Sequence, residues 1–283
     1  MRRFAWVYSA VLALFTVYLA LDTFVIARVY APTLPVETTE SISAETTAAP
    51  VEASYTLSEH RTHDTTVYVV TLTLSEPGQL RTVLARNAYG RNLTEATSSM
   101  AARVGAAVAI NGDYYGSRER GYVIRNGELL RDSSAGGEDL VIWGDGSFSI
   151  INEREVTADE LLAQGAEQVF CFGPALVVDG EIAVEPGEEV GKAMVSNPRT
   201  AIGIDAAGTL YLVVSDGRTR QSAGLSLREL AEFMQELGCS VAYNLDGGGS
   251  STLVVDGRVV NNPTTNGRNV SERSVSDCVC FIP

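Results

Sequence analysis

Histidine is scarce in this sequence, which has only His60 and His63 among its 283 residues. With so few, no Ser-His-Asp or Cys-His catalytic group is evident, and any acid or base catalysis must use carboxylates. The H-x-x-H spacing followed by Asp64 is compatible with a metal site. No third ligand can be argued from position, however, and exposed polar side chains are the default interpretation.

Basic residues are also in short supply, with 21 Lys and Arg against 35 Asp and Glu and a net charge of −14. This balance argues against sequence-independent binding of nucleic acid, because the phosphates need a basic face on the protein. The hydrophobic content of 45 % nevertheless indicates a folded core and not a disordered chain.

Cysteine is limited to four residues, Cys171, Cys239, Cys278 and Cys280. Their spacing lacks the paired C-x₂-C pattern of a structural zinc site. In an exported domain a disulfide is plausible, but four cysteines allow three complete pairings, and buried thiols are the alternative.

The N-terminus contains the longest apolar run, 18 uncharged residues from Phe4 to Leu21. A helix of that length covers about 27 Å, enough for a thin bilayer. Arg2 and Arg3 precede it, so the positive-inside rule keeps the N-terminus cytoplasmic and places the rest outside. We predict an uncleaved signal anchor, because the aromatic residues Trp6, Tyr8, Tyr18 and Tyr30 suit a helix that stays in the membrane and no persuasive cleavage site ends the run. A cleaved signal peptide is the alternative.

Three regions follow from composition. Residues 1–30 form the cytoplasmic tip and the anchor helix, and residues 31–54, rich in Thr, Glu, Ala and Pro, read as a disordered stalk. Residues 55–283 form one domain, in which no internal repeat is evident.

The pattern of the domain is mostly that of strands. Residues 65–74 alternate like a half-buried strand, and hairpin turns are expected at four Asn-Gly or Asp-Gly pairs. These pairs begin at Asn126, Asp145, Asp179 and Asp256. Helices are expected at 226–238, at 93–103 with Asn92 or Thr94 as its cap, and from Thr157, the first and last of them opened by capping boxes. The mixture predicts an α+β domain with a central mixed β-sheet and few helices.

The stretch "NLDGGGSSTLVVDG" (244–257) is the most unusual. It is not a serine-hydrolase elbow, which needs G-x-S-x-G before a helix, and it is not a dinucleotide fingerprint. We expect a strand end that carries Asp246, followed by main-chain N–H groups of Gly247, Gly248 and Gly249 that bind an anion, with hydroxyl donors from Ser250 onward. The alternative is a glycine-rich bulge or tight bend.

Two further strand ends carry polar residues. "AVAINGDYYG" (107–116) places Asn111, Asp113 and Tyr114 where they suit a sugar site, unless this is an Asn-Gly turn with packed tyrosines. "SNPRTAIGID" (196–205) places Arg199 and Thr200 at a strand mouth, where the arginine can hold an oxyanion or form an ordinary surface salt bridge.

Other charged candidates lie near glycine-rich loops. They are Asp216 and Arg218 in "SDGRTRQSAG" (215–224) and Glu272 and Arg273 in "NVSERSVSDC" (269–278).

Taken together, five segments resemble the phosphodiester glycosidase family. They are "NGDYY" (111–115), "NPRTAIGID" (197–205), "VSDGR" (214–218), "NLDGGGSSTLVVDG" (244–257) and "RSVSD" (273–277). The likeness covers about residues 100 to 283, and the second and fourth segments together are specific. It implies a hydrolase without a cofactor, which cleaves a sugar from a sugar-1-phosphodiester. With the predicted anchor, we expect a membrane-anchored, extracytoplasmic enzyme whose substrate is related to cell-envelope glycan or exopolysaccharide.

The same resemblance implies roles for the candidates. Asp246 is the base or nucleophile on the sugar side, with Asp113 or Glu272 as the second carboxylate. Arg199, Arg273 and the glycine amides hold the phosphate.

Two alternatives come from other functional classes. The first is a non-catalytic binder of anionic cell-wall polymer or exopolysaccharide. The second is a metal-dependent phosphodiesterase that uses Asp113, Asp216 and Asp246.

Overall fold

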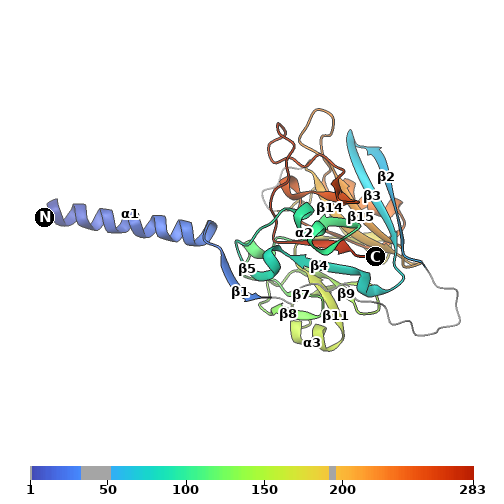
Figure 1. The fold of residues 1–283 in the computed structure, drawn as a ribbon, viewed down its shortest axis with the longest axis horizontal. Coiled ribbons are helices and arrows are strands. Elements are labelled where there is room, and N and C mark those ends of the chain that lie inside the picture. Colours follow the sequence, from blue (N-terminus) through green and yellow to red (C-terminus); the bar gives the residue numbers. More distant parts are fainter. Residues whose placement is uncertain (1, 33–51, 191–195) are drawn as a thin grey trace.

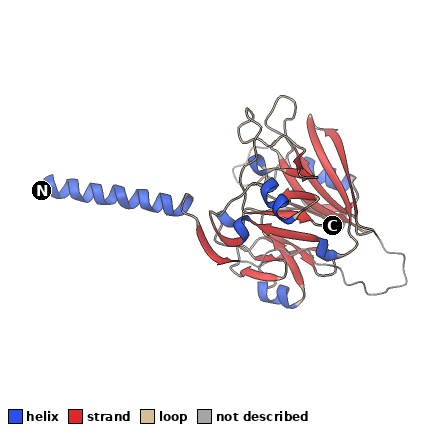
Figure 2. Ribbon diagram, in the orientation of Figure 1, coloured by secondary structure: helices blue, strands red, loops and turns tan. Residues whose placement is uncertain are grey.

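The structure, a computed structural model, describes residues 2–32, 52–190 and 196–283. A long N-terminal helix, α1 (Arg2–Phe24), projects away from a domain built of sheets, and shorter helices lie on the outside of those sheets (Figures 1 and 2). The α+β class is confirmed. Most of the expected stalk, residues 33–51, lies outside the described residues, but residues 28–32 form a strand on the domain.

The strands form three main sheets, not one central sheet, and the pairs between described strands are antiparallel. The seven-stranded sheet has the order β13-β12-β16-β14-β15-β3-β2. Its strands are β2 (Ser54–Thr62), β3 (Thr65–Thr73), β12 (Ala175–Val178), β13 (Glu181–Ile182), β14 (Arg199–Asp205), β15 (Leu210–Ser215) and β16 (Cys239–Asn244).

A five-stranded sheet of order β18-β17-β6-β19-β4 packs against it. Its strands are β4 (Leu80–Leu84), β6 (Val108–Asn111), β17 (Leu253–Val255), β18 (Arg258–Val259) and β19 (Asp277–Phe281). The other five-stranded sheet, of order β10-β9-β11-β7-β8, adds to the same core. Its strands are β7 (Val123–Arg125), β8 (Glu128–Arg131), β9 (Glu138–Trp143), β10 (Phe148–Asn152) and β11 (Ala166–Phe170).

The main core lies between these sheets. Buried side chains such as Val70, Ile202, Ile110 and Phe281 meet there, one pair from each of two facing sheets. The antiparallel arrangement follows from the short turns. At Asn126-Gly127, Asp179-Gly180 and Asp256-Gly257 both residues have positive φ, as the tightest hairpins require.

Each remaining helix covers the outer face of a sheet. The helices are α2 (Thr97–Val104), α3 (Ala158–Ala163) and α4 (Leu227–Glu236). The capping boxes at Thr157 and Ser226 are both formed. Helix α2 begins later than expected, because its first turn is capped from outside: the Glu272 carboxylate accepts from the Ser98 backbone N–H at 3.0 Å and from its hydroxyl at 2.6 Å.

A small two-stranded sheet connects the long helix to the domain. Strand β1 (Arg28–Pro32) pairs with β5 (Ala88–Arg91) in antiparallel register. The end of α1 therefore sits against the loop that follows β5.

Candidate active site

The candidate site forms where the ends of β6 and β16 meet. The side-chain amide of Asn111 donates to the carbonyl of Asp246 at 2.6 Å, and the Asp246 backbone N–H donates to the carbonyl of Gly112 at 3.2 Å. These bonds fix two loops side by side, one carrying Asp113 and the other Asp246.

A cavity of about 410 Å³ opens at this junction. Its lining residues are Phe24, Val25, Asn92, Thr94, Asp113, Tyr114, Ser117, Asp246, Ser250, Arg273, Ser274, Val275 and Ser276. The lining thus combines two carboxyl groups, one guanidinium and several hydroxyls. That set suits a small polar ligand that carries negative charge.

Asp246 is held in a buried, hydrogen-bonded position. The Ser250 hydroxyl donates to its Oδ2 at 2.5 Å, and Arg273 approaches the same oxygen at 3.2 Å. Burial raises the pKa of Asp246 above its ordinary value, while Arg273 and the Ser250 bond act in the opposite direction. A carboxyl group so placed can exchange a proton or attack a carbon centre.

Arg273 is the cation at the mouth of the cavity, with its side chain 41 % exposed. Its Nε donates to the Ser250 hydroxyl at 2.9 Å, and Nη2 also contacts Ser250 and Asp246. Among the described residues Nη1 makes no hydrogen bond. Arg273 can therefore hold an incoming anion while it stays paired with Asp246.

Asp113 forms part of the cavity wall, and its side chain is buried in an ion cluster. Its Oδ1 accepts from the Tyr115 backbone N–H at 2.9 Å, and Arg125 lies 3.0 Å from its Oδ2. The same arginine donates to Asp277 at 2.9 Å and stacks 4.3 Å above the ring of Phe170. Burial, with added repulsion from Asp113, raises the pKa of Asp277 to about 7.

Sequence reasoning did not select Arg125 or Asp277. Arg125 ends the apolar run "YVIR" before the Asn126-Gly127 turn, and its complete burial was not visible from that pattern. The signal that could have identified Arg125 is a charged residue at the end of an apolar strand. Asp277 stands in the quoted segment "RSVSD", where only the arginine was chosen.

The glycine triplet is shaped by the protein's own packing. A Cβ on Gly247 would lie 2.9 Å from the Pro198 carbonyl oxygen, and one on Gly248 would lie 2.8 Å from the Arg218 guanidinium. Gly249 is pressed against Thr265 in the same way. The main-chain N–H of Gly248 donates to the Pro198 carbonyl at 2.8 Å. We expected the three glycine amides to bind an anion together, but the Gly248 amide is already bonded within the protein. The triplet is a tight bend, the alternative left open by the sequence.

Asn111 and Thr200 are structural supports beneath the site. Both are fully buried, and the Thr200 hydroxyl donates to the Asn111 side-chain oxygen at 2.8 Å. That oxygen also accepts from the Thr252 backbone N–H at 3.2 Å. The structure therefore places Asn111 in the position of a clamp for the Asp246 loop, in contrast to the sugar contact expected for it.

Arg199 and Asp216 lie outside the cavity lining. Arg199 is buried, paired with Glu189 at 2.5 Å, and donates to the Leu225 carbonyl at 2.8 Å. Asp216 holds the loop after β18, accepting twice from Asn262, each time at 2.7 Å. Neither side chain is brought to the cavity with Asp246.

Arg218 and Glu272 also serve local structure. Arg218 donates to Asn197 and to the Thr265 carbonyl, and burial followed by repulsion from Arg273 lowers its pKa. Both carboxylate oxygens of Glu272 accept hydrogen bonds from Ser98 at the start of α2. Asp113 is therefore the carboxyl group that joins Asp246 at the cavity.

The remaining metal and redox candidates are dispersed. His60 contacts Ser58 at 2.9 Å, and His63 pairs with Glu229 at 3.1 Å. Within the described residues no three His, Cys, Asp or Glu side chains cluster closely enough to hold a metal ion. Asp113, Asp216 and Asp246 therefore do not form such a cluster either. The four cysteines are buried and unbridged.

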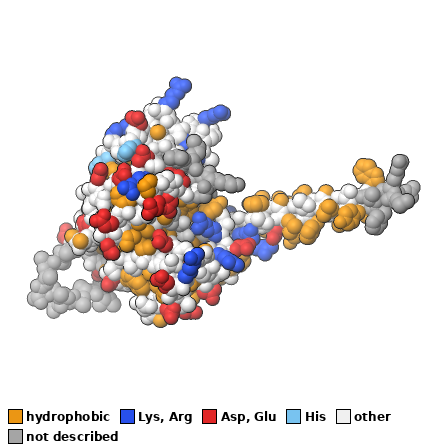
Figure 3. All heavy atoms as spheres, turned by 180° about the vertical axis from the view of Figure 1, so that it is seen from behind, with side chains coloured by type: hydrophobic (Ala, Val, Ile, Leu, Met, Phe, Trp, Pro, Cys, Tyr) orange, Lys and Arg blue, Asp and Glu red, His pale blue; other side chains and the backbone are white. Residues whose placement is uncertain are grey.

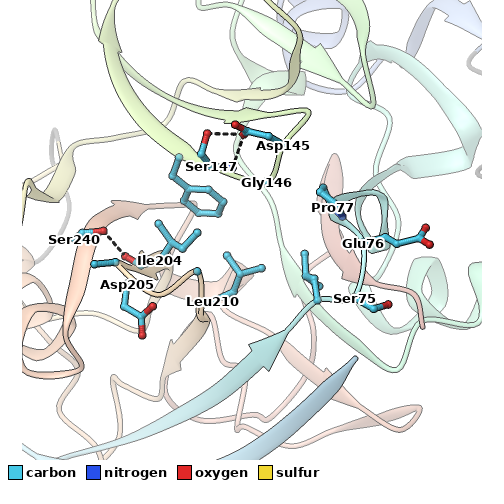
Figure 4. A pocket seen from close by; sticks show the side chains of 14 residues that line it. Ser75, Glu76, Pro77, Asp145, Gly146, Ser147, Ile204, Asp205, Leu210 and Ser240 are labelled. Carbon is cyan, nitrogen blue, oxygen red and sulfur yellow. Dashed lines mark hydrogen bonds between the residues drawn. The ribbon is translucent and has the colours of Figure 1, made fainter. Parts of the chain in front are cut away.

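A second cavity, of about 470 Å³, lies between the β9–β10 and β14–β15 turns. Figure 4 shows Ile204 and Leu210 facing the hollow, with the carboxylate of Glu76 pointing away from it. The charged residues that line it are the acids Glu76, Asp145 and Asp205. Without a lining cation it offers nothing for a phosphate, so the cavity at Asp246 is the better candidate.

Comparisons of the sequence place the chain in a known family. Residues 104–282 match the phosphodiester glycosidase family. The chain is 36 % identical over 180 residues to the SPbeta prophage-derived uncharacterized protein YomE of Bacillus subtilis. It is 33 % identical over 196 residues to the N-acetylglucosamine-1-phosphodiester alpha-N-acetylglucosaminidase of Bos taurus. Each alignment covers 62 % of this chain but only 28 % and 37 % of these relatives' own lengths.

Solved structures show the same fold. The zebrafish N-acetylglucosamine-1-phosphodiester alpha-N-acetylglucosaminidase catalytic domain, auto-inhibited by its pro-peptide, superposes with a TM-score of 0.65 at 20 % identity. That match covers 92 % of this chain and 89 % of the zebrafish chain. A hypothetical protein from Synechocystis superposes with a TM-score of 0.59 at 18 % identity, over 83 % of this chain and 64 % of the other.

Proposed function

Because the chain belongs to the phosphodiester glycosidase family, we propose that it is a hydrolase that releases a sugar from a sugar-1-phosphodiester. The observation that carries this proposal is the pairing of buried Asp246 with half-exposed Arg273 in one cavity. A phosphodiester glycosidase needs a carboxyl group for the sugar carbon and a cation for the phosphate, and these two residues supply both.

The chemistry explains why histidine is dispensable. The leaving group is a phosphate monoester, whose second pKa is about 6, so it needs little protonation as the bond breaks. Stabilising its developing charge is the larger task, and Arg273 is placed to do it. Asp246 acts on the sugar side, as the base for water or as the nucleophile.

Two other lining residues complete the proposed sugar site. Tyr114 is 44 % exposed at the cavity and offers a ring on which a sugar can stack. Asp113 is the second carboxylate, fixed by Arg125 and by the Tyr115 backbone N–H. The metal-dependent alternative loses support, because Asp216 is committed to Asn262.

The membrane placement is also part of the proposal. Residues Trp6–Phe24 are long and apolar enough to cross a bilayer, and none of that span is buried in the protein. We propose that α1 anchors the chain, with the domain on the extracytoplasmic side and acting on cell-envelope glycan or exopolysaccharide.

The test uses the full chain with a set of methyl diesters of sugar 1-phosphates that differ only in the sugar. Release of free sugar and methyl phosphate, unaffected by chelator, is the expected result. Asp246→Asn should lower the rate by orders of magnitude, whereas the matched variant Asp179→Asn, on an exposed hairpin turn, should not.

Other outcomes are equally informative. Binding of the diesters without turnover, unchanged in Asp246→Asn, would support the non-catalytic binder instead. Turnover abolished by chelator would make the carboxylates metal ligands.

A further inference from the structure

The end of the N-terminal helix takes part in the candidate site. Phe24 and Val25 line the same cavity as Asp246 and Arg273. This contact is fixed by hydrogen bonds to the loop after β5, where Asn92 donates to the Ile26 carbonyl at 3.0 Å. The end of α1 therefore forms part of the cavity wall, and its position relative to the cavity is fixed.

The length of the helix sets the height of the cavity above a membrane. The candidate span Trp6–Phe24 has 19 residues, which cover about 28 Å at 1.5 Å per residue. The hydrocarbon layer of a bilayer is about 30 Å thick. If the helix crosses the bilayer, Phe24 lies at its outer boundary, and the cavity that Phe24 lines lies among the lipid headgroups.

The surface around this junction has the character of a membrane interface. Phe24 is 78 % exposed and Val25 is 65 % exposed, while Val29 and Tyr30 are 60 % and 57 % exposed. Aromatic side chains concentrate at this level of a bilayer. Figure 1 shows that the rest of α1 projects away from the domain, and Figure 3 shows basic side chains on the domain beside the helix exit.

From this juxtaposition we propose that the substrate is a lipid-linked sugar phosphodiester. Its aglycone remains in the bilayer while its sugar 1-phosphate enters the cavity. The inference rests on the proposed function and adds the class of the aglycone. Phe24 and Val25 contact the first methylenes of the lipid, and Arg273 binds the phosphate at headgroup height.

The reaction balances without any further reactant. Water adds its oxygen to the anomeric carbon, the bond from that carbon to the phosphate oxygen breaks, and its electron pair leaves with the phosphate. The products are the free sugar and a lipid monophosphate, and the proton from water passes to Asp246 and then to solvent. The lipid product stays in the membrane.

The test compares two aglycones on the sugar identified by the soluble methyl diesters. The full chain is placed in phosphatidylcholine vesicles and given either the methyl diester in solution or the hexadecyl diester in the bilayer. Confinement to the same surface should raise kcat/KM for the hexadecyl diester about 10²-fold or more over the methyl diester.

A linker insertion tests the position of the cavity relative to the bilayer separately from the hydrolysis reaction. A flexible Gly-Ser insert of about 12 residues between Ile26 and Ala27 adds an average reach of about 19 Å, which frees the domain from the helix end. The insert leaves both partners on one surface but removes the fixed position of the cavity at headgroup height, so it should reduce the preference for the hexadecyl diester and leave the methyl diester rate unchanged. The same insert at the Asp179-Gly180 turn should keep the preference. Phe24→Ala should raise KM for the hexadecyl diester alone.

Two results would overturn the inference. One is equal kcat/KM for both aglycones in the unmodified chain, and the other is a hexadecyl preference that the insert at Ile26 does not reduce. If no sugar is released from any methyl or hexadecyl diester, the proposed function itself fails, and this inference fails with it.

Discussion

The buried cluster of Asp113, Arg125 and Asp277 predicts an unusual dependence of stability on pH. Burial, with added repulsion from Asp113, outweighs the attraction of Arg125 and raises the pKa of Asp277 from 3.8 to about 7. A raised pKa means that the folded state binds the proton more tightly than the unfolded state. The stability gained from this proton is complete below about pH 4 and is lost as the pH rises towards and through about 7.

The magnitude follows from the two pKa values. With 3.8 for the unfolded chain and about 7 for the folded protein, linkage gives a loss of about 2–3 kcal/mol between pH 5 and pH 8. The variant Asp277→Asn keeps the shape of the protonated acid but cannot titrate. The difference in unfolding free energy between the unmodified protein and the variant should therefore shift by about 2–3 kcal/mol over that range.

Urea unfolding of the full chain at pH 5 and pH 8, followed by tryptophan fluorescence, measures this difference. Burial also raises the pKa of Asp139, to about 9, but this residue is present in both proteins and its contribution cancels in the difference. Asp179→Asn, at an exposed turn, is the matched control and should show no shift. A difference between unmodified protein and Asp277→Asn that is the same at both pH values would refute the idea that Asp277 holds a proton in the folded protein.

Three further predictions test the surroundings of the cavity. Glu272→Ala removes the cap of α2 and should lower the unfolding free energy by about 1 kcal/mol, measured by urea unfolding; a fall in kcat of orders of magnitude would instead make it a site carboxylate. Gly249→Ala forces a Cβ to 3.1 Å from the backbone it faces and should cost about 1–3 kcal/mol in thermal or urea unfolding, whereas Gly137→Ala, with open space around it, should not. Arg273→Gln removes a cation that lowers the pKa of Asp246, so the acidic limb of the pH–rate profile should move to higher pH while KM rises; an unmoved limb would show that Asp246 does not carry that limb.

Local features of the fold could be predicted from the sequence because they depend on neighbouring residues. The capping boxes at Thr157 and Ser226 and the Asp-Gly and Asn-Gly turns are of this kind. The start of α2 could not be predicted, because Glu272, far along the chain, supplies its cap. The division into three sheets is likewise set by long-range pairing, which strand patterns do not encode.

The same distinction applies to the site. Asp246, Asp113, Tyr114, Ser250 and Arg273 were selected from polar residues at strand ends, and the structure brings them to one cavity. Residue type alone could not distinguish arginines that face a cavity from those whose guanidinium groups are hydrogen-bonded or paired within the protein.

Arg199 illustrates that limit. It sits at the mouth of a strand, as an oxyanion ligand would, but its guanidinium is paired with Glu189 and bonded to the Leu225 carbonyl. Those partners lie in separate loops, and only the folded chain shows that they converge.

The three glycines after Asp246 have a consequence for how this motif is used in recognising related proteins. Each is required by a different neighbour, namely the Pro198 carbonyl, the Arg218 guanidinium and Thr265. Selection on the triplet therefore acts through folding, whether or not the protein is an enzyme. A relative that kept the glycines but replaced Asp246 or Arg273 would retain this bend without the two residues on which the proposed activity depends, so those two positions are the ones to inspect before a relative is assigned an activity.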